Sequence, residues 1–254
     1  MARMARSVVV TGAADGIGRA IAAHFAQLGE RVALLDYDAD KLERTSAELG
    51  NGVLPIRTDV RQGFAVDAAI ARAADAHGGV DIAVNNAAVY PNTAVVDMSE
   101  DEWDNVLDTN LKGAFLFMRA AARQMLQQGR GGKLCLIASG AYKSARRGAS
   151  HYCASKAGLV MLAKTLALEL AEHHINVNVV SPGFIEVGLR PGVSVPYRER
   201  IKHDIPWGRF GDPSEIARAV AFLCSADAEF VTGSVLNVDG GSSAGRFHLP
   251  YSKT

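Results

Sequence analysis

The chain has 254 residues, of which 48% are hydrophobic and 21% are charged. A chain of this length buries a core of its own without metal ions or disulfide bonds. Lysine and arginine together number 27, as do aspartate and glutamate, so the formal net charge is +0. No net field attracts a nucleic acid or an anionic membrane, and we expect neither as a partner.

The cysteines and the N-terminal segment predict a soluble, cytoplasmic protein without a metal site. Three cysteines, Cys135, Cys153 and Cys224, are too few and too scattered for a disulfide framework or a Cys-x-x-Cys site. Only three valines separate the basic N-terminus from Thr11-Gly12. A secretory signal needs about 7–15 apolar residues there and a membrane helix about 20.

Short runs rich in valine, isoleucine and leucine predict buried parallel strands. These runs are Ser7–Val10, Val32–Leu35, Val53–Ile56, Ile82–Val84, Lys133–Ala138, Asn176–Val180 and Ser234–Val238. Helical stretches alternate with them, at Ile17–Leu28, Asp40–Leu49, Gly63–His77, Asp101–Gln128, Ser150–His173 and Ser214–Cys224. With no linker and no internal repeat, this alternation predicts a single domain over residues 1–254. Its expected fold is α/β, a Rossmann-type doubly wound sheet of about seven parallel strands with helices on both faces.

A glycine-rich turn follows the first predicted strand and opens the helix at Ile17. Gly12, Gly16 and Gly18 permit a tight turn and bring the backbone close to a pyrophosphate, which the helix N-terminus attracts. Asp36 follows the second predicted strand, 18 residues past Gly18, where a carboxylate can bind the ribose hydroxyls of a dinucleotide. The pattern predicts a dinucleotide-binding site.

Two carboxylates in this region favour NAD over NADP. Asp36 accepts hydrogen bonds from a ribose 2′-hydroxyl but repels a 2′-phosphate, and Asp15 adds a second negative charge inside the glycine turn. Arg31 and Lys41 are near in sequence, and we expect both on a solvated surface.

Tyr152 and Lys156 are four residues apart in a predicted helix, which places them on one face. A phenol has a pKa near 10, and a nearby ammonium group lowers it toward the range of a useful acid or base. Ser139 ends the fifth predicted strand, at the edge where open α/β sheets bind ligands. A hydroxyl there can steady a substrate oxygen while Tyr152 moves a proton.

With these pieces in order, the sequence resembles the classical short-chain dehydrogenase/reductase family over nearly its whole length. The motifs that carry the resemblance are Thr11–Gly18, Asp59-Val60, Asn85-Asn86-Ala87-Ala88, Asn110, Ser139, Tyr152 with Lys156, Ser181-Pro182-Gly183 and Asp239-Gly240-Gly241.

The resemblance implies a role for each matching residue. Tyr152 is the expected catalytic acid or base, and Lys156 lowers its pKa and holds the nicotinamide ribose. Ser139 orients the substrate oxygen, and Asn110 anchors a water-linked proton relay. The remaining implied cofactor contacts are Asp59, Val60, Asn85, Ala87, Pro182, Gly183 and Ile185.

Two positions depart from the family pattern. Ala88 stands where glycine is usual, a small change. Val187 stands where the family often has threonine, so a hydroxyl bond to the cofactor worth about 1 kcal/mol is lost.

The implied reaction is hydride transfer between a secondary alcohol and nicotinamide. The candidate substrates are a sugar, a polyol or a hydroxy acid. The nearest alternative is a 3-oxoacyl-thioester reductase of the acyl carrier protein type, although such family members usually use NADPH. A non-catalytic dinucleotide sensor is a further alternative, which the presence of all four catalytic residues disfavours.

The segment around residues 186–205 shows no helical or strand period and is expected to cover the substrate. Arg146 and Arg147 border the pocket between Ser139 and Tyr152, and Tyr142 is a further candidate to line it. The tail 242–254 is expected to dock, with a neighbouring subunit as the candidate partner, since it carries Phe247, Leu249 and Tyr251. The resemblance also implies a homotetramer or homodimer.

Overall fold

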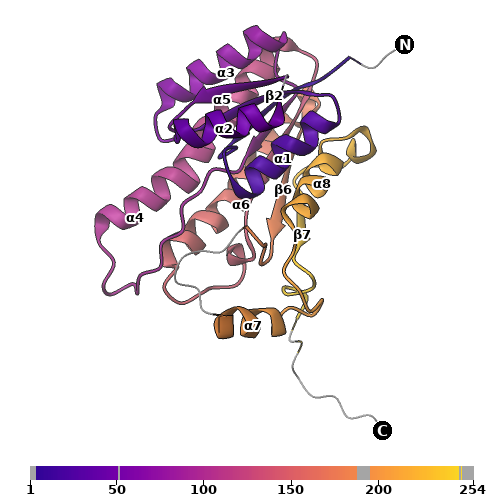
Figure 1. Cartoon of the computed structure of the whole chain (residues 1–254). Coiled ribbons are helices and arrows are strands. Elements are labelled where there is room, and N and C mark those ends of the chain that lie inside the picture. Colours follow the sequence, from indigo (N-terminus) through magenta and orange to yellow (C-terminus); the bar gives the residue numbers. More distant parts are fainter. Residues whose placement is uncertain (1–3, 51, 188–194, 246, 248–254) are drawn as a thin grey trace.

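The computed structural model describes residues 4–50, 52–187, 195–245 and 247. Among these, seven parallel strands form one sheet in the order β3-β2-β1-β4-β5-β6-β7 (Figure 1). The strands are β1 (Ser7–Thr11), β2 (Arg31–Asp36), β3 (Val53–Arg57), β4 (Ile82–Asn85), β5 (Gly132–Ile137), β6 (Ile175–Pro182) and β7 (Val235–Val238). The predicted doubly wound α/β fold is confirmed.

Helices cover both faces of the sheet (Figure 1). One face packs against α1 (Gly16–Gln27), α2 (Ala39–Leu49) and α8 (Pro213–Leu223). The other face packs against α3 (Gly63–His77), α5 (Gly113–Gln128) and α6 (Ser150–Leu170). The shorter helices α4 (Glu100–Leu107) and α7 (Val195–His203) lie toward the end of the molecule where the strands finish.

Strand β1 shows why the strands have sequences of consecutive apolar residues. Successive side chains of a strand point to opposite faces, and here both faces are covered. Val9 therefore joins the core beneath α3, α5 and α6, while Val8 and Val10 join the core beneath α1 and α8. All three valines are fully buried.

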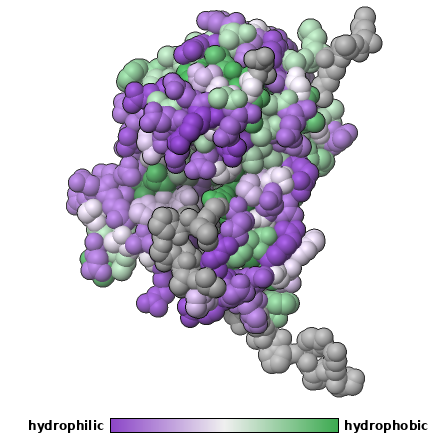
Figure 2. Space-filling model, in the orientation of Figure 1, coloured by the Kyte–Doolittle hydropathy of each residue, from purple (hydrophilic) through white to green (hydrophobic). Residues whose placement is uncertain are grey.

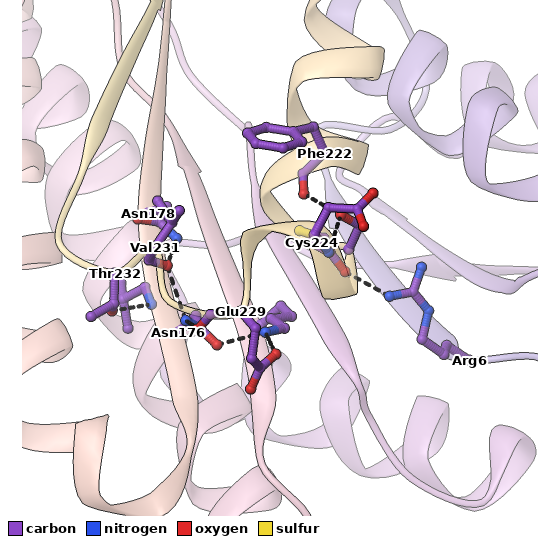
Figure 3. A network of polar contacts seen from close by, with 12 residues as sticks. Arg6, Asn176, Asn178, Phe222, Cys224, Glu229, Val231 and Thr232 are labelled. Atoms are coloured by element: carbon purple, nitrogen blue, oxygen red, sulfur yellow. Dashed lines mark hydrogen bonds and ion pairs between the residues drawn. The ribbon is translucent and has the colours of Figure 1, made fainter.

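Polar side chains form hydrogen bonds with the connection between α8 and β7 (Figure 3). Asn176 donates to the carbonyls of Glu229 and Val231 at 2.9 Å each, and Asn178 donates to Val231 at 2.7 Å. Arg6 donates to the carbonyl of Cys224 at 2.6 Å. These bonds satisfy backbone carbonyl groups at the end of α8 and in the connection from α8 to β7.

Two segments differ from the prediction. The helix expected over Asp101–Gln128 is divided into α4 and α5 by a π-helical turn, Asp108–Lys112. The stretch expected to lack regular structure contains α7, whose nine residues show no clear apolar stripe. Residues 188–194 of the expected substrate loop, and 246 and 248–254 of the tail, lie outside the described residues.

The side of the molecule drawn in Figure 2 is mainly hydrophilic, with its hydrophobic residues in separate groups. Within the described ranges, no helix is both long enough and apolar enough to cross a membrane.

Candidate active site

A cavity of about 1300 Å³ opens at the carboxyl edge of the sheet. Its walls come from the segments that follow the strands, so residues distant in sequence meet there. Pockets for single small ligands measure roughly 300–1000 Å³, so this cavity has room for a dinucleotide and a second, small molecule. The predicted site residues that line it are Gly12, Asp15, Gly16, Ile17, Asp36, Asp59, Val60, Ala87, Ser139, Tyr152, Lys156, Pro182, Gly183 and Ile185.

The glycine turn needs its glycines for two different reasons. Gly12 and Gly16 have φ angles of +62° and +54°, a left-handed backbone that favours glycine. Gly18 has no such constraint, but a Cβ atom there would overlap the Gly12 carbonyl oxygen. Gly18 is thus required for packing and does not itself line the cavity.

Hydrogen bonds join this turn to the residues that follow the neighbouring strand β4. The Thr11 hydroxyl accepts the backbone N–H groups of Asn86 at 3.0 Å and Ala87 at 3.2 Å. The Asn86 amide donates in return to the carbonyls of Thr11 and Gly12, at 3.1 and 3.0 Å. Asn86 also lines the cavity. Its role was missed in the sequence because only the paired strands reveal its partners.

Carboxylates dominate this end of the cavity. Asp36 accepts the backbone N–H groups of Ala14 and Asp38, each at 3.1 Å, which fix its carboxylate at the end of β2. Lys41 is exposed, as expected, and it also lines the cavity, where it pairs with Asp15 at 3.3 Å. Asp59 pairs with Arg61, whose hydrogen bond lowers the pKa of Asp59.

These residues fit a dinucleotide. The N-terminus of α1 reaches the cavity through Gly16 and Ile17, where backbone N–H groups attract phosphate oxygens. Asp36 lies within the same wall and offers carboxylate oxygens to ribose hydroxyls. Val187 faces Gly16, its Cγ1 only 3.6 Å from where a Cβ would stand, so an apolar group occupies the position at which the family often has a hydroxyl.

Tyr152, Ser139 and Lys156 meet at the other end of the cavity. Burial raises the pKa of Tyr152, while its hydrogen bond with Ser139 and the positive charge of Arg146 lower it. Lys156 is 2% exposed and donates to the Ile137 carbonyl at 2.8 Å. Its Nζ lies 5.7 Å from the centroid of the Tyr152 ring.

Asn110 lies in the π-helical turn, fully buried and outside the cavity wall. Its amide exchanges two 2.8 Å bonds with the backbone of Val89 and donates to the Ser155 hydroxyl at 3.3 Å. Ser155 in turn donates to the Tyr152 carbonyl at 2.7 Å. The Asn110 side chain thus joins the segment after β4 to the helix that carries Tyr152.

His151 holds the first turn of α6. The residue at the N-cap, Ala149, has no side-chain acceptor for the free N–H groups of that turn. The fully buried His151 supplies one, because its Nδ1 accepts the Tyr152 backbone N–H at 2.9 Å. The ring proton is then on Nε2, which donates to Glu102 at 3.1 Å. Nothing in the local sequence marks this contact between α4 and α6.

Other residues fall outside the cavity wall. Asn85 is 1% exposed within β4, and its Nδ2 has no hydrogen-bond partner among the described residues. Tyr142 packs partly buried against the core. Of the two adjacent arginines, Arg146 lines the cavity and Arg147 does not. The described part of the chain contains no group of three or more side chains that could hold a metal ion.

An open α/β sheet with a glycine turn, an acidic residue at the end of β2 and a tyrosine–lysine pair at its carboxyl edge is typical of nucleotide-dependent oxidoreductases. The chain matches the family described as Enoyl-(Acyl carrier protein) reductase over residues 12–243. The chain belongs to the short-chain dehydrogenase/reductase family.

Several characterised relatives are similar over almost the whole chain. A 3-oxoacyl-(acyl-carrier-protein) reductase from Staphylococcus epidermidis is 39% identical, covering 94% of this chain and 99% of the relative. Galactitol 2-dehydrogenase from Agrobacterium fabrum is 33% identical, covering 92% and 96%. A solved short-chain type dehydrogenase/reductase from Mycobacterium marinum superimposes with a TM-score of 0.89 at 38% identity, covering 94% and 96%.

The buried lysine predicts a pH-dependent stability difference. Burial lowers the pKa of Lys156 from 10.5 to about 8, so the charged form costs stability below about pH 8 and the cost fades as the pH rises toward 10.5. Lys156→Met removes this cost. We expect its unfolding free energy relative to wild type to fall by about 2 kcal/mol between about pH 7 and about pH 9.5.

Urea unfolding at both pH values measures this difference. Lys164→Met, which alters an exposed lysine of the same helix, is the control and should give the same difference at each pH. An equal pH response of the two variants would contradict the prediction.

Proposed function

We propose that the protein is an NAD-dependent oxidoreductase that interconverts a secondary alcohol and a ketone. The observation that carries the proposal is the placement of Tyr152, Ser139 and Lys156 at one end of a cavity whose other end holds the glycine turn and Asp36. The bound dinucleotide supplies the acceptor or donor of the hydride. The chain supplies the proton transfer and the orientation of the substrate.

Tyr152 exchanges a proton with the substrate oxygen. In the oxidation direction its phenolate accepts the hydroxyl proton, and Ser139 holds the same oxygen by a hydrogen bond. Lys156 stands beside the Tyr152 ring with its Nζ anchored to Ile137, which leaves its other N–H donors for a ribose. Asn110 keeps the helix of Tyr152 in register with the cavity wall and is the proposed anchor of the proton relay.

The proposed cofactor contacts are the predicted site residues that line the cavity. Asn85 and Gly18, which were also predicted as contacts, lie behind the wall, and Gly18 allows the close packing of the glycine turn. NAD is favoured because Asp36 forms no ion pair with any described residue, whereas the two cations at the same end of the cavity, Lys41 and Arg61, are paired with Asp15 and Asp59. An unpaired carboxylate repels a 2′-phosphate.

The proposed substrates are a sugar, a polyol or a hydroxy acid. Similarity to galactitol 2-dehydrogenase supports this class. Similarity to the Staphylococcus epidermidis reductase supports a second candidate, the reduction of a 3-oxoacyl thioester on an acyl carrier protein. The proposed location is the cytoplasm, with which three free cysteines agree.

The first prediction concerns Tyr152. Tyr152→Phe removes the proton donor but keeps the ring, so we expect turnover to fall at least about 100-fold while the Kd for NADH changes little. Absorbance at the NADH band measures oxidation of a panel of sugars, polyols, hydroxy acids and hydroxyacyl thioesters, and NADH fluorescence gives the Kd. Tyr142→Phe, a tyrosine outside the cavity wall, is the control. Full activity of Tyr152→Phe would remove Tyr152 from its role.

The second prediction concerns cofactor choice. Asp36→Asn removes the negative charge at the ribose, so we expect the preference for NAD over NADP to fall about tenfold, or ~1.4 kcal/mol. Titration of both cofactors measures the preference, and Asp40→Asn, an exposed aspartate outside the cavity wall, is the control. Tighter binding of NADPH than NADH by the wild type would contradict the proposal.

The third prediction concerns assembly into a homotetramer. Apolar side chains project from the long helices, with Phe115 on α5 44% exposed, and Met161 and Leu168 on α6 61% and 84% exposed. Burying these side chains between subunits stabilises an oligomer. Light scattering gives the mass in solution, and a stable monomer would contradict the expectation.

A further inference from the structure

The two ends of the cavity carry opposite charge. At the cofactor end the wall holds four aspartates and two cations, Asp15, Asp36, Asp38, Asp59, Lys41 and Arg61. At the Tyr152 end the loop after Ser139 contributes two cations, Lys143 and Arg146. The one further carboxylate in the described wall, Asp239, accepts the backbone N–H groups of Gly241 and Ser243.

Arg146 is a cation of this loop that a ligand can reach. Its side chain is exposed to the cavity and takes part in no ion pair or hydrogen bond within the described chain. Lys143, by contrast, lies over the ring of Tyr142 at 5.6 Å. An unpaired arginine with a planar fork of donors binds a carboxylate through two parallel hydrogen bonds.

The loop that carries Arg146 is held in place. The Arg146 carbonyl accepts the Ala149 N–H at 3.2 Å, and the Gly148 carbonyl accepts the Thr93 N–H at 2.9 Å. Arg146 is therefore presented from a fixed backbone just before α6. Its neighbour Arg147 leaves the same backbone but does not line the cavity.

Extending the proposed function, we propose that the substrate is a small hydroxy acid, or the matching oxo acid, whose carboxylate binds Arg146. The loop that carries Arg146 joins Ser139 to α6, which carries Tyr152, and all three side chains line the cavity, so an anion bound by Arg146 lies near the reacting carbon. A carboxylate a few carbons from the alcohol meets that condition. The phosphate of an acyl-pantetheine arm does not, because the long arm separates it from the reacting group.

Matched pairs of substrates test the proposal. Gluconate and sorbitol share their chain length and inner hydroxyl configuration and differ at one terminal carbon, a carboxylate in one and a hydroxymethyl group in the other. We compare kcat/KM for such acid and polyol pairs in wild type, Arg146→Gln and Arg147→Gln. The ratio within a pair cancels any change in the pKa of Tyr152, which affects both substrates alike.

We expect wild type and Arg147→Gln to prefer the acid, and Arg146→Gln to lose about tenfold of that preference, the worth of a charge-assisted hydrogen bond. Titration calorimetry of each acid and polyol, with NADH present, gives the same comparison for binding alone. The proposal is overturned if no acid binds more tightly than its polyol partner, or if Arg147→Gln loses the preference equally.

A separate titration tests whether Arg146 binds a phosphate group instead of a carboxylate. We titrate 3-oxoacyl thioesters of pantetheine and of 4′-phosphopantetheine, and a loss in Arg146→Gln confined to the phosphorylated thioester also overturns the proposal. Absence of turnover with every substrate, together with Arg146-dependent binding of the acids, would instead refute the proposed oxidoreductase function and leave the carboxylate site standing.

Discussion

The position of β1 between β2 and β4 is the constraint on which the site depends. The chain runs outward from β1 to β3 and then returns to β1's other side to begin β4. The connections after β1 and β4 therefore leave toward opposite faces of the sheet, and a crevice opens between them. The bonds of Thr11 and Asn86 span this point and hold the two strand ends together at the floor of the crevice.

Charge burial sets the chemistry at the far end of that crevice. Lys156 is held among apolar and backbone groups that disfavour its charge, which lowers its pKa to about 8. An ammonium group so little stabilised by the protein gains from a partner brought in by a ligand. Burial also disfavours the ionised form of Tyr152, whereas Ser139 and Arg146 favour that form. Burial thus disfavours the charged forms of both side chains, and a bound ligand that supplies a partner stabilises them.

The helix that carries these groups is fixed from two sides. Asn110 reaches it through Ser155, and Glu102 reaches it through His151, both from the helical segment that contains the π-helical turn. π-helical turns are often found at functional sites. Here the turn brings Asn110 to face α6, so one irregularity in a helix positions the proton-transferring side chain on another.

The sequence alone determined the strand–helix alternation, the glycine turn, Asp36 after β2 and the four-residue spacing of Tyr152 and Lys156. These features follow from local rules: apolar runs make buried strands, glycine permits positive φ, and helical periodicity aligns residues four apart. The fold was predicted almost completely, and most of the proposed site residues lie together as expected. Helix α7 was missed because its short sequence has no apolar stripe, and the π-helical turn because it interrupts no local pattern.

The tertiary structure alone decided which charges face the cavity and which groups support the site. Arg146 and Arg147 are identical in type and adjacent in sequence, yet one lines the cavity and the other does not. Lys41 of α2 pairs with Asp15 at the start of α1, and His151 meets Glu102 from another helix. These contacts join residues 26 and 49 positions apart. The direction of a side chain and the charge it meets depend on where distant segments pack, and no local pattern records that.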